Sequence, residues 1–150
     1  MKFDINKLLE LGLLKKIPKS KQKAEESINT AYSWLKEAEN NLKSRAFRSC
    51  ILSSYLAMFH SARATLFING FREKSHFAVA RFLENFYVKK NLLEEKWVEL
   101  LDYYRELRHE DQYSTSFIAT EAEAESALKF AKEFVEEIKK LLKINLAEKL

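Results

Sequence analysis

Turn-forming residues and cysteine are scarce in this sequence. Its 150 residues include two Gly, one Pro and one Cys. A strand-rich fold needs turn residues every ten residues or so, and this chain cannot supply them. The single cysteine, Cys50, excludes an internal disulfide, and its apolar neighbours predict a buried, unreactive thiol. The scarcity therefore favours long helices joined by short loops.

Long uncharged apolar runs are also missing. No stretch reaches the length needed to span a membrane, and charged residues interrupt the N-terminal apolar residues in a way that does not fit a secretory signal. Nothing in the composition demands an oxidising compartment, so we expect a cytoplasmic protein that does not associate with a membrane. With 47% hydrophobic and 32% charged residues, a chain of this length can form one globular domain without a disulfide or a metal.

Apolar residues recur at three- and four-residue steps through most of the chain, which is the period of an amphipathic α-helix. The stretch at 46–68 is apolar nearly all round, as in the central helix of a bundle. The pattern predicts an all-α fold, an up-and-down bundle of four to five helices over residues 20–150. The expected helices cover residues 20–44, 46–68, 75–90, 91–111 and 120–142. Residues 1–19 are expected to form a basic N-terminal arm, with a short helix at 4–14 and a linker from residue 15.

Residues that commonly start or stop helices support these boundaries. Gly70 suits a left-handed cap at the end of the central helix. Ser75 and Asn91 can cap the third and fourth helices. Thr120 begins the last helix as a capping box with Glu123, after a loop at 112–119 that is rich in Ser and Thr.

Charge is unevenly distributed along the chain. Residues 1–23 contain seven basic and two acidic side chains, and residues 43–90 contain nine basic and two acidic ones. Basic patches attract phosphate-bearing ligands through electrostatics that do not depend on sequence. Solvated faces that pair with the acidic helices would explain the same pattern, so charge alone does not decide between the two interpretations.

The segment at 103–113 is the most informative for function. Helical spacing places Arg108 toward the core-facing side, where an arginine needs a carboxylate or a phosphate as partner. Arg105 and His109 lie one turn apart on the edge of the same stripe, and Tyr113 continues the line. Arginine binds phosphate bidentately and histidine exchanges protons near neutral pH, so the set predicts a phosphate site. The alternative is an ordinary helix C-terminus, where basic side chains favour the helix dipole.

Two further clusters could contribute to a ligand site. His60 and Arg63 lie one turn apart in the apolar helix, near Tyr55. The alternative to a ligand site is a buried polar network that holds the helices in register. Ser75 and His76 stand at a helix N-terminus, which can bind an anion. A helix cap alone would explain Ser75 equally well.

Other chemistries find little support in the sequence. The histidines lie on separate elements without HxxxH or ExxH spacing, so we expect no metal site. No phosphate-binding glycine loop and no GxSxG nucleophile elbow is present. We therefore expect no bound cofactor.

Several stretches together resemble the HEPN family of helical-bundle proteins. Residues 55–64 form an aromatic-rich run that ends in an Ala-Arg pair followed by alanine, similar to that family's second helix. The Ser-His-Phe at 75–77 and the aromatic residues after it are similar to the next helix. The tract at 107–113 and the helix at 121–134 resemble the family's Arg…Tyr turn and final helix. The resemblance covers roughly residues 24–142.

The resemblance implies a bundle that dimerises across a cleft and works with a partner. Many members are metal-independent ribonucleases, and many pair with a small nucleotidyltransferase as a toxin–antitoxin system. In the nuclease members an Arg and a His with four to six residues between them form the active site. Here Arg105 and His109 have only three residues between them, which departs from that motif. Arg108 and Tyr113 match the branch of small stand-alone members associated with a minimal nucleotidyltransferase.

The leading hypothesis is a homodimeric HEPN protein that binds a nucleotide or RNA phosphate and acts with a nucleotidyltransferase partner. The candidate catalytic pair is Arg105 and His109. The candidate ligand-binding residues are Arg108, Tyr113, His60, Arg63, Ser75 and His76. The resemblance also makes Tyr113 a candidate for modification by that partner. The alternatives are a dimeric ribonuclease that uses Arg105 and His109, and a non-catalytic helical adaptor.

Overall fold

The computed structural model describes residues 3–113 and 118–148, and the side chains of 3–109 and 118–143. The described residues contain six α-helices, one π-helical turn and one pair of short strands. The predicted all-α bundle is confirmed. Four helices are long: α2 (Lys21–Lys43), α3 (Phe47–Asn69), α5 (Glu95–Tyr113) and α6 (Glu121–Glu148).

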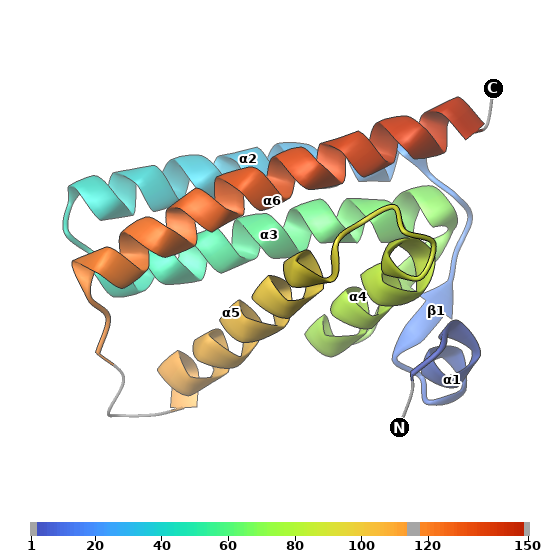
Figure 1. Ribbon diagram of the computed structural model, residues 1–150, viewed down its shortest axis with the longest axis horizontal. Helices are drawn as coiled ribbons and strands as arrows, with labels where there is room; N and C mark the ends of the chain where they lie inside the picture. Colours follow the sequence, from blue (N-terminus) through green and yellow to red (C-terminus); the bar gives the residue numbers. More distant parts are fainter. Residues whose placement is uncertain (1–2, 114–117, 149–150) are drawn as a thin grey trace.

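The central helix of the bundle is α3. It contacts α2, α6, α5, α4 (His76–Leu83) and β2 (Phe71–Glu73), and fifteen of its 23 residues are buried. Figure 1 shows α2, α3 and α6 running alongside one another, with α5 crossing α3 at an angle. A helix surrounded in this way must be apolar on nearly all sides, as its sequence predicted.

Small side chains allow α2 and α3 to pack closely. On α2, Ala24, Ala31 and Ala38 follow one another at seven-residue steps, and all three are buried. The hydroxyl of Ser27, on the same face, donates a hydrogen bond of 2.6 Å to the backbone carbonyl of His60. Burial of this alanine stripe fixes the register of the two helices, because a shift along either axis would bring larger side chains into the seam.

The N-terminal arm differs from the prediction. Its helix α1 is shorter than expected, Ile5–Glu10, and a strand β1, Leu14–Lys16, lies in the region predicted to be a linker. Strand β1 pairs with β2 in antiparallel register, so that Lys15 lies opposite Arg72. Leu8 and Leu14 are both buried in the main core. The arm is therefore packed onto the end of α3, and its separation as a unit at residue 19 stays a prediction.

The helix boundaries agree with some predicted caps and not with others. Gly70 ends α3 with φ +83°, and the Ser75 hydroxyl accepts a hydrogen bond of 3.2 Å from the backbone N–H of Ala78, as expected. Thr120 likewise accepts from the backbone N–H of Glu123 at 3.2 Å. The expected cap at Asn91 is wrong, because this residue adopts φ +59° and α5 begins four residues later.

Two further differences concern the middle of the chain. The predicted third helix changes at Glu84 into a π-helical turn, Glu84–Val88, in which the backbone N–H of Lys89 bonds the carbonyl of Glu84. The loop expected at 112–119 begins later, because α5 continues to Tyr113. Helix α5 is thus displaced toward the C-terminus relative to the predicted helix, with both its start and its end later in the chain.

Candidate functional site

A polar cavity of about 660 Å³ lies where the start of α4 faces the second half of α5. Three of its lining residues come from the N-terminus of α4 and four from α5: Ser75, His76, Phe77, Arg105, Glu106, Arg108 and His109. Ser75 fixes the start of α4 as its N-cap, and the adjacent loop brings that helix end against α5. Five of the predicted ligand residues therefore line one cavity, although they come from two separate parts of the sequence. We call this cavity the α4–α5 cavity.

His76 is held in the wall of the α4–α5 cavity by aromatic side chains of α3. Its ring stacks on Phe59 with 3.9 Å between centroids and 8° between planes. The Nδ1 atom lies 2.7 Å from the hydroxyl of Tyr55 and 3.3 Å from Nη1 of Arg108. Burial, together with the positive charge of Arg108, lowers the pKa of His76 to about 4.

These contacts define the protonation state of His76. An arginine can only donate, so the contact with Arg108 requires Nδ1 to be an acceptor. Burial raises the pKa of Tyr55, so its phenol keeps the proton and donates it to the same nitrogen. At neutral pH the ring is therefore uncharged and carries its proton on Nε2.

Arg108 is half-buried and lacks an acidic partner among the side chains that the structure describes. Its guanidinium carbon lies 5.8 Å from the ring centroid of Tyr55, and its other polar contact is the neutral His76. Neither partner carries a negative charge. Since a positive charge partly withdrawn from water is unfavourable without an anion, Arg108 makes the α4–α5 cavity a place where an anion would be stabilised.

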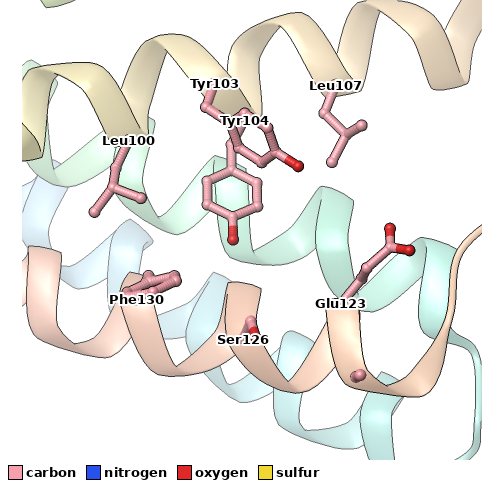
Figure 2. Close-up of a pocket in the computed structure, with 8 residues that line it drawn as sticks. Leu100, Tyr103, Tyr104, Leu107, Glu123, Ser126 and Phe130 are labelled. Carbon is pink, nitrogen blue, oxygen red and sulfur yellow. The ribbon is translucent and has the colours of Figure 1, made fainter.

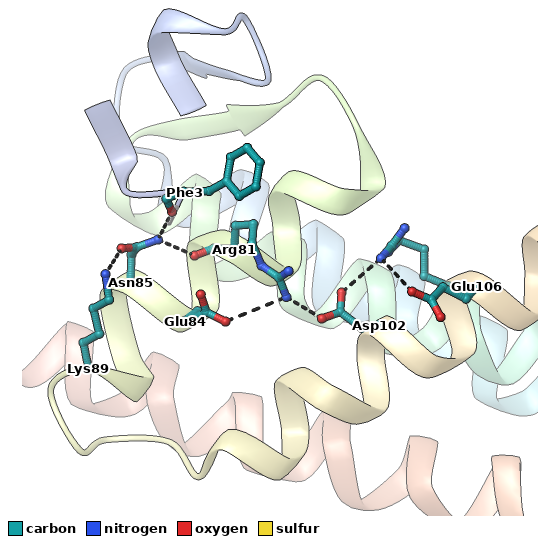
Figure 3. Close-up of polar contacts among 8 residues, drawn as sticks. Phe3, Arg81, Glu84, Asn85, Lys89, Asp102 and Glu106 are labelled. Atoms are coloured by element: carbon teal, nitrogen blue, oxygen red, sulfur yellow. Dashed lines mark hydrogen bonds and ion pairs between the residues drawn. The ribbon is translucent and has the colours of Figure 1, made fainter. Parts of the chain in front are cut away.

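Arg105 has a different environment, and its acidic neighbours Asp102 and Glu106 are labelled in Figure 3. Its Nη2 lies 3.3 Å from Asp102 and 3.7 Å from Glu106. Asp102 also forms an ion pair with Arg81 of α4, so a single carboxylate bridges two arginines. The guanidinium groups of Arg81 and Arg105 both lie near the ring of Phe77, at 5.0 and 5.6 Å. Much of the charge of Arg105 is therefore already compensated, and the network ties α4 to α5.

His109 is exposed and lines the α4–α5 cavity one helical turn beyond Arg105. The side chain of Tyr113 lies outside the described residues, although its backbone belongs to α5. Arg105, Arg108 and His109, which were predicted to lie on one edge of a helix, thus all line the same cavity.

His60 and Arg63 lie at a different place. Both line a second, smaller cavity of about 280 Å³ between α2, α3 and β2. Arg63 forms an ion pair with Glu73 of β2, and burial, together with Arg63, lowers the pKa of His60. The structure therefore separates this pair from the α4–α5 cavity and moves Tyr55, expected beside them, to His76. We call the smaller cavity the α2–α3 cavity.

Three residues of the site were not predicted from the sequence. Phe59 reads as an ordinary member of the apolar face of the helix at 46–68, and neither Arg81 nor Asp102 belongs to a recognisable motif. Their roles depend on contacts between elements far apart in the chain. The sequence does contain one signal for these contacts: Asp102 stands three positions before Arg105, and opposite charges at this spacing pair on a helix.

An apolar hollow of about 490 Å³ lies between α5 and α6. Figure 2 shows Leu100 and Tyr104 of α5 on the side of Phe130 and Ser126, and Leu107 on the side of Glu123, the charged residue of the lining. Burial raises the pKa of Tyr104 to about 12, so this phenol stays neutral. With so few polar groups, this hollow offers no chemistry comparable to that of the α4–α5 cavity.

Comparison with known proteins agrees with the helical fold. The HEPN domain matches residues 24–141, which is most of the chain. The chain belongs to the HEPN domain family. It is 32% identical over 116 residues to a protein of Methanocaldococcus jannaschii named "Putative toxin MJ0605", covering 77% of this chain and 86% of that protein. All five residues that line the α4–α5 cavity and were predicted as ligand contacts lie within the HEPN match.

No described helix is both long and apolar enough to cross a membrane. Among the described side chains, no group of three His, Cys, Asp or Glu is arranged to hold a metal ion.

Proposed function

We propose that this HEPN protein binds the phosphate of a nucleotide or an RNA in the α4–α5 cavity. The observation that carries the proposal is Arg108, a half-buried guanidinium whose described partners, Tyr55 and His76, are both neutral. An anionic oxygen at the cavity would supply the missing charge and accept one or two of its hydrogen bonds.

The start of α4 adds to the attraction for an anion. The first backbone N–H groups of a helix have no partner within the helix and carry the positive end of its dipole. Here that end lies in the cavity wall, between Ser75 and Phe77. A neutral His76 contributes a hydrogen-bond donor without repelling the cation beside it. Arg108, the helix end and the imidazole therefore act on the same ligand.

Binding of AMP by isothermal titration calorimetry tests the proposal. Arg108→Gln should lower the affinity by about tenfold or more, since one charge-assisted hydrogen bond contributes roughly 1.5–3 kcal/mol. The matched control is Arg45→Gln, which removes the same charge from an exposed side chain that lines neither polar cavity. An equal effect of both variants, or no binding of AMP to the wild type, would refute the assignment of Arg108.

The name of the archaeal relative supports a toxin-like role, and a toxin-like HEPN protein needs a neutralising partner. We propose that the partner is a minimal nucleotidyltransferase, that the protein acts in the cytoplasm as a homodimer, and that Tyr113 is the residue the partner modifies. Co-expression with an adjacent nucleotidyltransferase, followed by intact mass measurement, should show an added nucleotidyl mass. The mass should be lost in Tyr113→Phe and kept in Tyr103→Phe.

A second candidate function is a metal-independent ribonuclease. It is favoured by the position of Arg105 and His109, one turn apart on the same cavity. In this reaction His109 would take the proton of a ribose 2′-hydroxyl, whose oxygen attacks the phosphorus to form a 2′,3′-cyclic phosphate. The bond to the 5′-oxygen breaks, and this oxygen leaves as a hydroxyl after it takes a proton from water. Cleavage in EDTA that disappears in His109→Ala would establish it. If the protein neither cleaves RNA nor binds AMP, the remaining hypothesis is a non-catalytic helical adaptor.

A further inference from the structure

A second concentration of positive charge lies in the α2–α3 cavity. Its cations are Lys23 of α2, Arg63 of α3 and Arg72 of β2, and His60 adds an imidazole. Lys23 and Arg63 both lie against the ring of Phe67, at 6.0 and 4.9 Å. The hollow thus gathers positive charge from three elements that meet because β2 folds back beside α3.

The charge balance of this cavity fits a phosphodiester better than a terminal phosphate. Glu73 pairs with Arg63, and Glu26 is the acidic residue in the lining, so two carboxylates face three cations. One positive charge remains. An internal phosphodiester carries one negative charge, whereas a phosphate monoester carries close to two at neutral pH.

One buried aromatic side chain, Phe59, lies between a residue of each polar cavity. Phe59 stacks face to face on His76, a residue of the α4–α5 cavity, with 3.9 Å between ring centroids. The same ring meets the edge of His60, which lines the α2–α3 cavity, at 5.3 Å. The two imidazoles are therefore no further apart than the sum of these distances. A short stretch of a single strand can cover such a span.

We infer that the α2–α3 cavity is a second phosphate subsite, and that the ligand is a single-stranded oligonucleotide whose backbone runs from one cavity to the other. The inference rests on the proposed binding of a phosphate in the α4–α5 cavity. It adds the class of ligand, because a mononucleotide can occupy only one of the two hollows. A basic groove beside aromatic side chains is the usual arrangement for single-stranded nucleic acid.

The test compares two probes on the full chain, AMP and 2′-O-methyl hexaadenylate, whose blocked hydroxyls prevent cleavage through the ribose. The double variant Lys23→Ala/Arg72→Ala removes two exposed cations of the second cavity and leaves the Arg63–Glu73 pair intact. The control Lys36→Ala/Lys129→Ala removes the same charge from exposed side chains that line neither polar cavity.

We expect the double variant to bind AMP within about twofold of the wild type and the hexamer about tenfold more weakly, in line with a lost charge-assisted contact. The slope of log affinity against log salt for the hexamer should fall by about 0.7, the value for one phosphate contact of a single strand. The control variant should change neither probe by more than twofold.

The outcomes separate the two proposals. If AMP binds through Arg108 but the hexamer loses no more affinity in the double variant than in the control, the second subsite is refuted and the first survives. If neither probe binds the wild type, both are refuted. If polyglutamate of matched charge competes with the hexamer as well as unlabelled hexamer does, the surface selects acidic chains in general and the oligonucleotide assignment is wrong.

Discussion

The hydrogen bond between Tyr55 and His76 connects the core to the candidate site, and Tyr55→Phe isolates it. The tyrosine is 1% exposed, and its ring also packs near Phe59. The substitution keeps the ring and removes only the hydroxyl that lies 2.7 Å from Nδ1 of His76. What remains for this nitrogen is the longer contact with Arg108, at 3.3 Å. Because a buried acceptor loses its main donor, we expect the free energy of unfolding to fall by about 1–2 kcal/mol.

Urea unfolding followed by circular dichroism at constant pH measures this cost. The matched control is Tyr103→Phe, because Tyr103 is 55% exposed on α5 and its hydroxyl can exchange freely with water. The control should change the free energy of unfolding by less than about 0.5 kcal/mol. If Tyr55→Phe proves no more destabilising than the control, the hydroxyl does not support His76, and the protonation state assigned to the imidazole is wrong.

Three further predictions concern pH, charge and backbone conformation. The pKa of His76 is about 4 in the fold and 6.5 unfolded, so the unfolded chain binds more protons between these values and stability must fall as pH is lowered through that window. Urea titrations at pH 7 and pH 4.5 should show a smaller loss for His76→Gln than for the wild type, and an identical loss would contradict the burial of this ring. Asp102→Asn should cost about 1–3 kcal/mol, since two partly buried arginines lose their shared carboxylate, whereas Glu106→Gln, 71% exposed, should cost under about 0.5 kcal/mol. Equal costs in the same urea assay would show that the bridge adds no stability. Gly70→Ala should destabilise by about 2–3 kcal/mol, because its φ is +83° and a Cβ would lie 2.9 Å from a backbone oxygen of the N-terminal arm. Gly12→Ala, with φ +72° and open space around the Cβ, should cost only about 1 kcal/mol, and a reversed order in thermal unfolding would contradict the crowding at Gly70.

The features that the sequence predicted well are those that depend on neighbours along the chain. Helix periodicity, the cap at Ser75 and the left-handed end at Gly70 are all set within one or two turns. The pairing of β1 with β2 was missed because each strand has three residues, too few for an alternating pattern. The start of α5 was misplaced because Asn91 is a good helix cap in isolation but takes a left-handed conformation in the turn it belongs to.

The candidate site was predictable in composition and not in arrangement. Arg105, Arg108 and His109 could be grouped because a helix fixes which side chains share an edge. That Ser75 and His76 face them depends on how α4 docks against α5, which no local pattern records. The same reasoning explains why Tyr55 was assigned to His60 and Arg63, its neighbours in sequence, and not to His76, its hydrogen-bond partner.

The pairing of β1 with β2 determines how a truncated form of this protein would behave. A fragment limited to residues 24–141, the stretch that matches the family, would lose β1 and leave β2 as an unprotected edge. Open edges of this kind recruit strands from other molecules. Removal of Leu14 would also uncover part of the core beneath it. Self-association of such a fragment would then report the missing arm and not the natural assembly of the protein.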